Sequence, residues 1–282
     1  MPIFTNQASL SYGCTVTNSN VTEGELIRNI GLTKTATTES YGRGEAITYV
    51  VTLTSSGASY SGLTLTDDLG NISGVEGSAP LTYIDGSVQY FVNGIPTAPP
   101  EVSADQTLTL SGIDVPANGT VTVIYAARVN CCASLEADSV IVNTVSAAGI
   151  GIAEVLTATD EVTIRNESQL TLSKAVCPDT FTTNDTVTYT LILQNTGNAP
   201  VVATDNLTVQ DVFNPILRDV TVTLNGAPLA EGTGYTYNET TGEFTTAEGA
   251  ITVPAATFAQ NEEDCVVTTT PGVAVLTVTG AI

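Results

Sequence analysis

An internal repeat limits the folds that this chain can adopt. A segment that starts at Leu32, LTKTATTESYGRGEAITYVVTLTSSG, matches a segment that starts at Leu170, LTLSKAVCPDTFTTNDTVTYTLILQNTG. Lys34 and Lys174 take equivalent places in the two copies. The repeat period is about 140 residues, which is too long for one unit of a solenoid and is typical of two tandem domains.

The residue pattern within each copy is typical of an all-β domain. Short runs rich in Thr and Val are separated by Gly, Asn, Asp and Pro, and no helical periodicity is sustained. About seven such runs in each copy predict two tandem immunoglobulin-like β-sandwiches. We expect an N-terminal donor strand and linker over 1–28, a complete sandwich over 29–166, and a second sandwich over 167–282 that lacks its last strand.

The two copies end differently. The first copy continues past Val129 with NCCASLEADSVIVNTVSAAGIGIAEVLTATDEVTI, whereas the second stops at Ile282, which aligns with Val129. The second sandwich therefore lacks its last strand or strands. We expect it to expose an apolar trough and an unpaired strand edge.

The opening of the chain resembles the missing piece. In MPIFTNQASLSYGCTVTNSN, apolar residues alternate with polar ones, which predicts a half-buried strand. FTNQASLSY matches IVNTVSAAG of the first copy, and a second match aligns TNSNVT with TATDEV. The side chains predicted to enter the trough are Phe4, Asn6, Ala8, Leu10 and Tyr12.

Three fates remain open for this donor strand. It inserts into the second sandwich of another copy, folds back onto its own second sandwich, or stays unpaired. We favour insertion into a neighbour, because four or five buried apolar side chains contribute on the order of 6–12 kcal/mol, besides a ladder of backbone hydrogen bonds. Such head-to-tail contacts propagate into filaments, so the expected partner is a second copy of this chain.

Composition argues against several functions. The formal charge of −22 disfavours nucleic acids and anionic membranes as partners, and no run of about 18 apolar residues predicts a membrane span. The chain has no histidine and no CxxC pair. We therefore expect no enzymatic activity, no cofactor and no metal site. The alternative to a structural subunit is a monomeric adhesin or ligand-binding stalk module.

Alternation also predicts polar residues that face each core. In the first copy these are Lys34, Asp67 and Asn143; for the second copy they are Lys174, Asp211 and Asn6. A desolvated lysine has a lowered pKa and can attack an asparagine amide that a protonated carboxyl polarises, which forms an isopeptide bond and releases ammonia. This resembles the self-crosslinking of some Gram-positive pilin domains. The alternative is that these residues are ordinary hydrogen-bonded polar groups.

The chain has five cysteines, an odd number that favours at least one bond between subunits. The candidates are Cys14, Cys131, Cys132, Cys177 and Cys265. Cys14 follows the donor strand, so a bridge to Cys177 or Cys265 of a neighbour is expected. The adjacent Cys131 and Cys132 point to opposite faces if extended, which favours different partners for the two. Reduced, buried thiols are the alternative.

The repeats resemble a known family. GEAITYVVTLTSSG and NDTVTYTLILQNTG, with the LTLTDDL and LTVQDVF that follow, are similar to the bacterial surface repeat known as domain of unknown function eleven. The first copy departs from its Asn-Thr-Gly signature at Ser55 and Ser56. The opening also resembles two-repeat proteins of spore-forming anaerobes, some similar to components of ribbon-like spore appendages. The resemblance implies a structural role outside a cell or spore. Synthesis inside a mother cell and release by lysis would explain an opening without a secretory leader; the alternative is that the numbering is that of a mature or recombinant chain whose leader has been removed.

Overall fold

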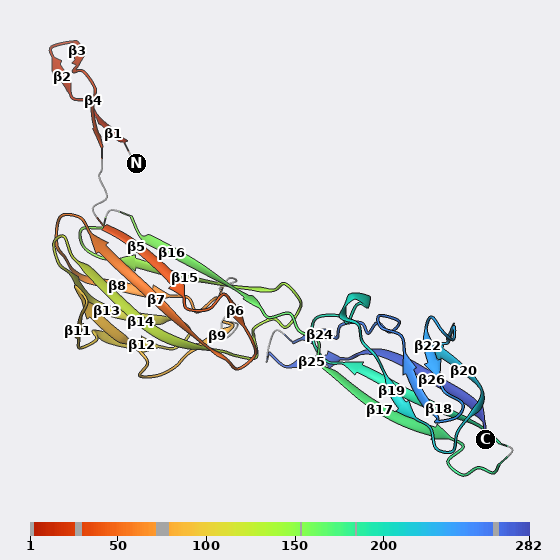
Figure 1. Ribbon diagram of the computed structural model, residues 1–282. Helices are drawn as coiled ribbons and strands as arrows, with labels where there is room; N and C mark the ends of the chain where they lie inside the picture. Colours follow the sequence, from red (N-terminus) through yellow and green to blue (C-terminus); the bar gives the residue numbers. More distant parts are fainter. Residues whose placement is uncertain (1–2, 26–29, 72–78, 153, 184, 262–264) are drawn as a thin grey trace.

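The computed structural model describes residues 3–25, 30–71, 79–152, 154–183, 185–261 and 265–282. These residues form β-strands and turns, with one 3₁₀ turn, η1 (Ala203–Asp205). Figure 1 shows an N-terminal hairpin followed by two β-sandwiches in a row. The prediction of an all-β chain with two tandem sandwiches is therefore confirmed. Within the described ranges, no helix is long and apolar enough to cross a membrane.

Domain one, as we call the first sandwich, consists of two sheets that enclose one core. The first sheet has the order β11 (Ile95–Thr97), β10 (Gln89–Val92), β14 (Thr120–Val129), β7 (Ala46–Ser55) and β5 (Ile30–Ala36), with β9 (Leu81–Tyr83) also paired to β14. The second has the order β12 (Glu101–Ala104), β13 (Leu108–Val115), β8 (Tyr60–Asp67), β15 (Val140–Ala148), β16 (Leu156–Ile164) and β6 (Ser40–Tyr41). Short extra strands raise the number above the seven or so expected.

The hairpin of β15 and β16 closes the core of domain one. Along β15, every second side chain is buried, with Ile141, Val145 and Ala147 facing the core. β15 pairs with β8 so that Val145 lies opposite Asp67, and β16 packs against β5. This alternation is the period of a strand with one buried face, and it covers the edge that β8 would otherwise expose.

Domain two, the second sandwich, has a full first sheet and a short second sheet. The first has the order β17 (Leu170–Cys177), β18 (Thr186–Asn195), β26 (Gly272–Ala281), β20 (Arg218–Leu224) and β21 (Ala227–Leu229). The second contains only β19 (Gln210–Val212), β23 (Glu243–Thr246) and β22 (Tyr235–Tyr237). A separate hairpin joins β24 (Thr257–Gln260) to β25 (Val267–Thr270).

Among the described residues of domain two, no strands correspond to β15 and β16. β19 takes the place of β8, but it pairs only with β23, and no strand among the described residues covers its other edge. As a result the inner face of β17 is open to solvent: Leu172 is 56% exposed, whereas its counterpart Leu32 is half-buried. We call the surface formed by the exposed inner face of β17 and the free edge of β19 the receptor groove.

The N-terminal segment forms a hairpin of its own. β1 (Ile3–Asn6) pairs with β4 (Thr22–Glu25), and β2 (Ser9–Tyr12) pairs with β3 (Thr15–Asn18). The strand that is predicted to be half-buried in another copy is exposed within one chain: Leu10 is 66% exposed and Tyr12 is more exposed still. Within one chain the segment pairs with itself and not with domain two. Figure 1 shows this hairpin beyond the end of domain one that is farther from domain two.

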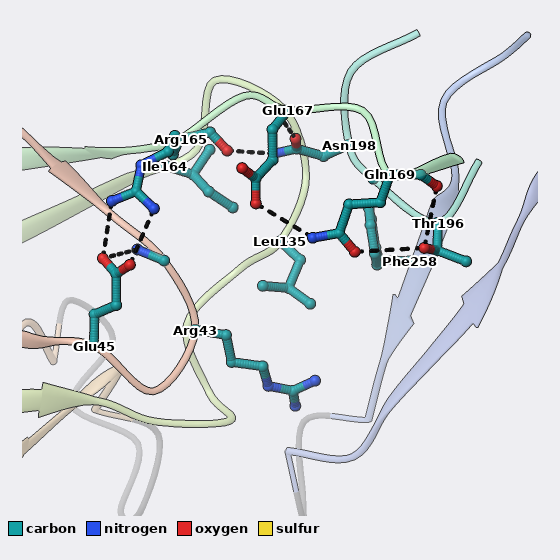
Figure 2. A pocket seen from close by; sticks show the side chains of 12 residues that line it. Arg43, Glu45, Leu135, Ile164, Arg165, Glu167, Gln169, Thr196, Asn198 and Phe258 are labelled. Atoms are coloured by element: carbon teal, nitrogen blue, oxygen red, sulfur yellow. Dashed lines mark hydrogen bonds and ion pairs between the residues drawn. The ribbon is translucent and has the colours of Figure 1, made fainter. Parts of the chain in front are cut away.

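The junction between the domains is tied by several contacts. A disulfide joins Cys132 of domain one to Cys265 of domain two, and the Gln260 side-chain amide donates a hydrogen bond to the Cys131 carbonyl at 2.9 Å. Figure 2 shows the hollow at this junction, with Leu135 of domain one and Phe258 of β24 on its wall. These links restrict bending between the two sandwiches.

Replacing both disulfide cysteines, Cys132 and Cys265, with serine is expected to loosen the junction and leave each sandwich folded. The bond connects residues 133 positions apart across two domains, so its loss widens the range of domain angles more than it affects either core. Small-angle X-ray scattering of the variant is expected to fit a broader distribution of shapes. The control is Cys131→Ser, which removes an exposed thiol from the same turn. A scattering profile identical to that of the unaltered chain would contradict the prediction.

Candidate functional site

A cluster of polar side chains lies inside the core of domain one. Lys34 comes from β5, Asp67 from the end of β8, and Asn143 from the middle of β15. The Lys34 side chain is 0% exposed and that of Asp67 is 3% exposed. Asn143 is fully buried. The three residues predicted from the alternation are thus buried in one core, contributed by both sheets.

Hydrogen bonds connect these side chains through a fourth residue. The Lys34 Nζ lies 2.6 Å from Oδ2 of Asp67. The Tyr125 hydroxyl donates to the same oxygen at 2.6 Å, and Nδ2 of Asn143 donates to the Tyr125 hydroxyl at 3.2 Å. The Leu69 backbone N–H donates to Oδ1 of Asp67 at 3.1 Å. Asp67 is therefore the centre of the cluster.

Burial moves the lysine and the aspartate toward their neutral forms. Desolvation lowers the pKa of Lys34, and the attraction of Asp67 opposes this shift without reversing it. Desolvation likewise raises the pKa of Asp67 against the opposing effects of Lys34 and Tyr125. Both shifts favour a neutral amine beside a protonated carboxyl. An uncharged amine is a nucleophile, and a protonated carboxyl can donate a hydrogen bond.

Two polar atoms in this cluster have unused hydrogen-bonding capacity. Oδ1 of Asn143 and the hydroxyl of Tyr49 are buried and have no hydrogen-bond partner. The Tyr49 ring stacks on the Tyr125 ring with centroids 5.5 Å apart, and the Lys34 Nζ lies 4.8 Å from the Tyr49 ring centroid. A buried acceptor without a donor costs free energy, so the Asn143 amide oxygen is a site where a further donor would be stabilising.

Domain two repeats the lysine and the aspartate in an open setting. The Lys174 ammonium forms a hydrogen bond and ion pair with Oδ2 of Asp211. Its nitrogen lies 4.6 Å from the Tyr189 ring centroid and 5.0 Å from that of Phe213. The side chains of Lys174 and Asp211 are 37% and 17% exposed within one chain, and their predicted burial requires the donor strand of another copy. Both side chains line the receptor groove. In domain one, β15 and β16 cover the equivalent lysine and aspartate.

Two parts of the domain-one cluster have no equivalent in domain two. Val278 lies opposite Tyr189 in the place where Tyr125 lies opposite Tyr49. In the part of domain two that the structure describes, no strand corresponds to β15, and no asparagine takes the place of Asn143. Asn6 is exposed in the N-terminal hairpin, away from Lys174 and Asp211.

The lysine content of the chain is concentrated in these clusters. The sequence contains two lysines, Lys34 and Lys174, and each lies beside an aspartate at the equivalent position of its sandwich. Tyr125 was not predicted. Alternation does indicate that Tyr125 faces the core, since it shares its parity with the buried residues Val121, Val123 and Ala127 of β14. It does not indicate that the hydroxyl joins the polar cluster, because an aromatic residue at such a position is more often an ordinary core residue.

The cysteines differ from expectation. Cys132 and Cys265 form a disulfide within one chain, so a bridge from Cys14 to Cys265 of a neighbour is not available while this bond exists. Cys14, Cys131 and Cys177 are exposed free thiols, so the alternative of reduced, buried thiols does not describe them. The Cys131 sulfur lies within 4.8 Å of the disulfide sulfurs, but a disulfide supplies no thiolate ligands for a metal.

No family model matches this chain, and no curated protein matches its sequence. Among solved structures, the major pilin subunit of Bacillus cereus aligns with a TM-score of 0.39 and 11% identity, over 94% of this chain and 70% of that one. A 35 kDa C-terminal fragment of the major pilin of Streptococcus agalactiae gives 0.37 and 11%, over 87% and 91%. A collagen-binding domain from a Staphylococcus aureus adhesin gives 0.31 and 11%, over 50% and 100%. These TM-scores are low, so the likeness carries no argument about function.

Proposed function

We propose that this chain is the structural subunit of a filament that assembles head to tail, with the N-terminal hairpin of one copy inserted into the receptor groove of the next. The observation that carries the proposal is the free edge of β19. In domain one the equivalent strand, β8, is covered by β15. In domain two nothing among the described residues covers it. Exposed edges of this kind are templates for pairing with another chain.

The N-terminal segment has the features that the groove requires. β15 and β16 form a hairpin, and residues 3–25 also form a hairpin. The alignment of FTNQASLSY with IVNTVSAAG matches Asn6 to Asn143 and Leu10 to Ala147. Leu10 is exposed in the free hairpin, whereas Ala147 is fully buried in domain one. A whole hairpin, and not only the first strand, is therefore the donated unit.

The direction of insertion favours a second copy over self-insertion. In domain one the tip of the β15–β16 hairpin lies at the Tyr60 end of β8, which is also the Ile30 end of β5. The same direction in domain two puts the hairpin tip at the Leu170 end of β17, near the domain junction. The open end of the hairpin, where β1 and β4 pair, then lies at the Cys177 end of β17, farthest from domain one. The five peptide steps from Glu25 to Ile30 span at most about 18 Å. A strand of ten residues is already about 33 Å long, so a linker of this length cannot extend past domain one to the Cys177 end of domain two in the same chain.

This direction also revises one cysteine prediction. Cys14 lies in the turn at the hairpin tip, so insertion brings it to the Leu170 end of the groove. Cys177 lies at the opposite end of β17, on the order of 20 Å away. We therefore no longer expect a bridge between Cys14 and Cys177 of a neighbour.

The location we propose is the outside of a cell or spore. The support is the resemblance of the repeats to the surface-repeat family and to spore-appendage components, together with the acidic composition and the disulfide. Each subunit then consists of the donor segment 1–28, the closed sandwich 29–166 and the receptor sandwich 167–282. Because the contact joins two different surfaces, every added subunit leaves a new free groove or hairpin, and growth continues.

Substituting Leu10 with glutamate is expected to abolish polymerisation, because a carboxylate would enter the apolar groove without a partner. The matched control is Ser9→Glu, one residue away on the opposite face of the same strand. Negative-stain electron microscopy and sedimentation of both variants, beside the full chain and a deletion of residues 1–22, test the prediction. Filaments from Leu10→Glu or from the deletion would contradict the proposal. A full chain that stays monomeric at all concentrations would favour the adhesin or stalk module.

A further inference from the structure

The two sandwiches differ in one part of the same cluster. Domain one contains a lysine, an aspartate and an asparagine, all buried and joined through hydrogen bonds. Domain two contains the lysine and the aspartate, and its described residues include no strand that would supply the asparagine. We propose that Lys174 and Asp211 are the receptor half of an amide-forming site that Asn6 of the next subunit completes, and that Lys34, Asp67 and Asn143 are the complete form of this site within one chain.

The strand register supports Asn6 as the missing residue. In domain one Val145 lies opposite Asp67, and Asn143 is two residues earlier, on the same face of β15. Ala8 aligns with Val145 and Asn6 with Asn143. A hairpin that pairs with β19 in the register of β15 therefore has Ala8 opposite Asp211. Asn6 then lies on the core-facing side next to Lys174.

The chemistry needs no further reactant. The neutral Nζ of the lysine attacks Cγ of the asparagine, so that a new Nζ–Cγ bond forms and the Cγ–Nδ2 bond breaks. The protonated aspartate polarises the amide oxygen, and the carboxyl then transfers a proton from Nζ to the departing Nδ2. The leaving group is ammonia, and the aspartate ends in its starting form. In domain one, the oxygen to be polarised is the buried Oδ1 of Asn143 that lacks a partner.

Docking is what completes the site in domain two. The Lys34 and Asp67 side chains are shielded by β15 and β16, whereas Lys174 and Asp211 are reached by solvent. Insertion of the hairpin supplies both the asparagine and the cover. The bond between subunits therefore forms only after the correct strand has docked, which restricts it to neighbours in the filament.

This inference rests on the proposed function, and denaturing analysis of assembled filaments separates the two. Filaments are boiled in detergent with a reductant, which removes disulfides, and are resolved by gel electrophoresis and mass spectrometry. We expect a ladder of multimers and a tryptic species that joins the peptides of Lys174 and Asn6. Monomeric material is expected to be lighter than its sequence mass by about 17 Da, the ammonia lost on forming the Lys34–Asn143 bond.

Substitutions at exposed positions test each half of the site. Asn6→Ala and Lys174→Arg are expected to lose the ladder, so that any filaments which these variants form dissolve to monomers on boiling. The control is Asn18→Ala, an asparagine of β3 in the same hairpin, which is expected to keep the ladder. Retention of the ladder in Asn6→Ala would overturn the assignment.

The denaturing gel and the mass of the unaltered chain have three further outcomes, and each overturns a different part of the proposal. Filaments of the unaltered chain that dissolve completely to monomers would overturn the bond between subunits and leave the strand-donation proposal standing. A monomer with unshifted mass would overturn the bond within domain one. Absence of filaments altogether would overturn the proposed function and the split site with it.

Discussion

Replacing Asp67 with alanine is expected to leave Lys34 as a free amine and to lower the free energy of unfolding of domain one by about 3–5 kcal/mol, because several buried polar groups each lose a hydrogen-bond partner at a cost of about 1–3 kcal/mol. Asp67 accepts hydrogen bonds from Tyr125 and from the Leu69 backbone, and it is the partner of a lysine whose side chain is fully buried. Its removal leaves these groups without a partner in a dry core. The melting temperature is expected to fall by on the order of 10 °C, as followed by circular dichroism.

The aligned substitution Asp211→Ala is the matched control. It makes the same chemical change at the equivalent strand position, but its lysine partner is 37% exposed. The expected cost in a monomer is therefore about 0–1 kcal/mol, the range of a solvent-exposed pair. Intact mass separates the roles further: Asp67→Ala is expected to regain the mass of the lost ammonia, whereas Asp211→Ala keeps the deficit of domain one. Equal destabilisation by the two substitutions would contradict the argument from burial.

Alternation along strands was sufficient to predict the buried cluster. Lys34, Asp67 and Asn143 each stand between apolar residues of the same parity, and a strand with one buried face sends all of them inward. The 140-residue match then transferred Lys34 to Lys174 and Asp67 to Asp211. Alternation does not encode whether the opposite sheet is complete; the comparison of the two repeats is what predicts that Lys174 and Asp211 lie in an incomplete sandwich.

Features that depend on the placement of whole elements were not predictable. The Cys132–Cys265 disulfide joins two sandwiches across 133 residues, and strand patterns contain no information on how the sandwiches meet. Tyr125 joins the cluster because β14 and β7 pair Tyr125 with Tyr49. The N-terminal hairpin depends on a turn at Gly13, whose φ of 61° is readily adopted by glycine. The alternation of residues 4–12 predicts a strand but does not indicate its partner, so the pairing of β2 with β3 and of β1 with β4 was not predicted.

Moving residues 1–25 from the start of the chain to a position after Ile282 is expected to produce a stable monomer that forms no filaments. A flexible linker as long as segment 130–139, which connects β14 to β15 in domain one, lets the hairpin enter the groove of its own domain two. The groove and the hairpin are then both occupied, so nothing remains to propagate. Size-exclusion chromatography with light scattering and electron microscopy measure this outcome.

The same rearranged chain is expected to stabilise domain two strongly. Insertion buries four or five apolar side chains, a gain on the order of 6–12 kcal/mol relative to a chain that simply lacks residues 1–25. The unfolding temperature of domain two is then expected to rise by on the order of 20 °C. A second ammonia is also expected to be lost, as Lys174 joins Asn6 within the chain. The control carries Leu10→Glu in the moved hairpin, which keeps the length and the linker but places a charge in the groove. If this control were as stable as the rearranged chain, or if the rearranged chain still polymerised, the hairpin would not be the strand that domain two lacks.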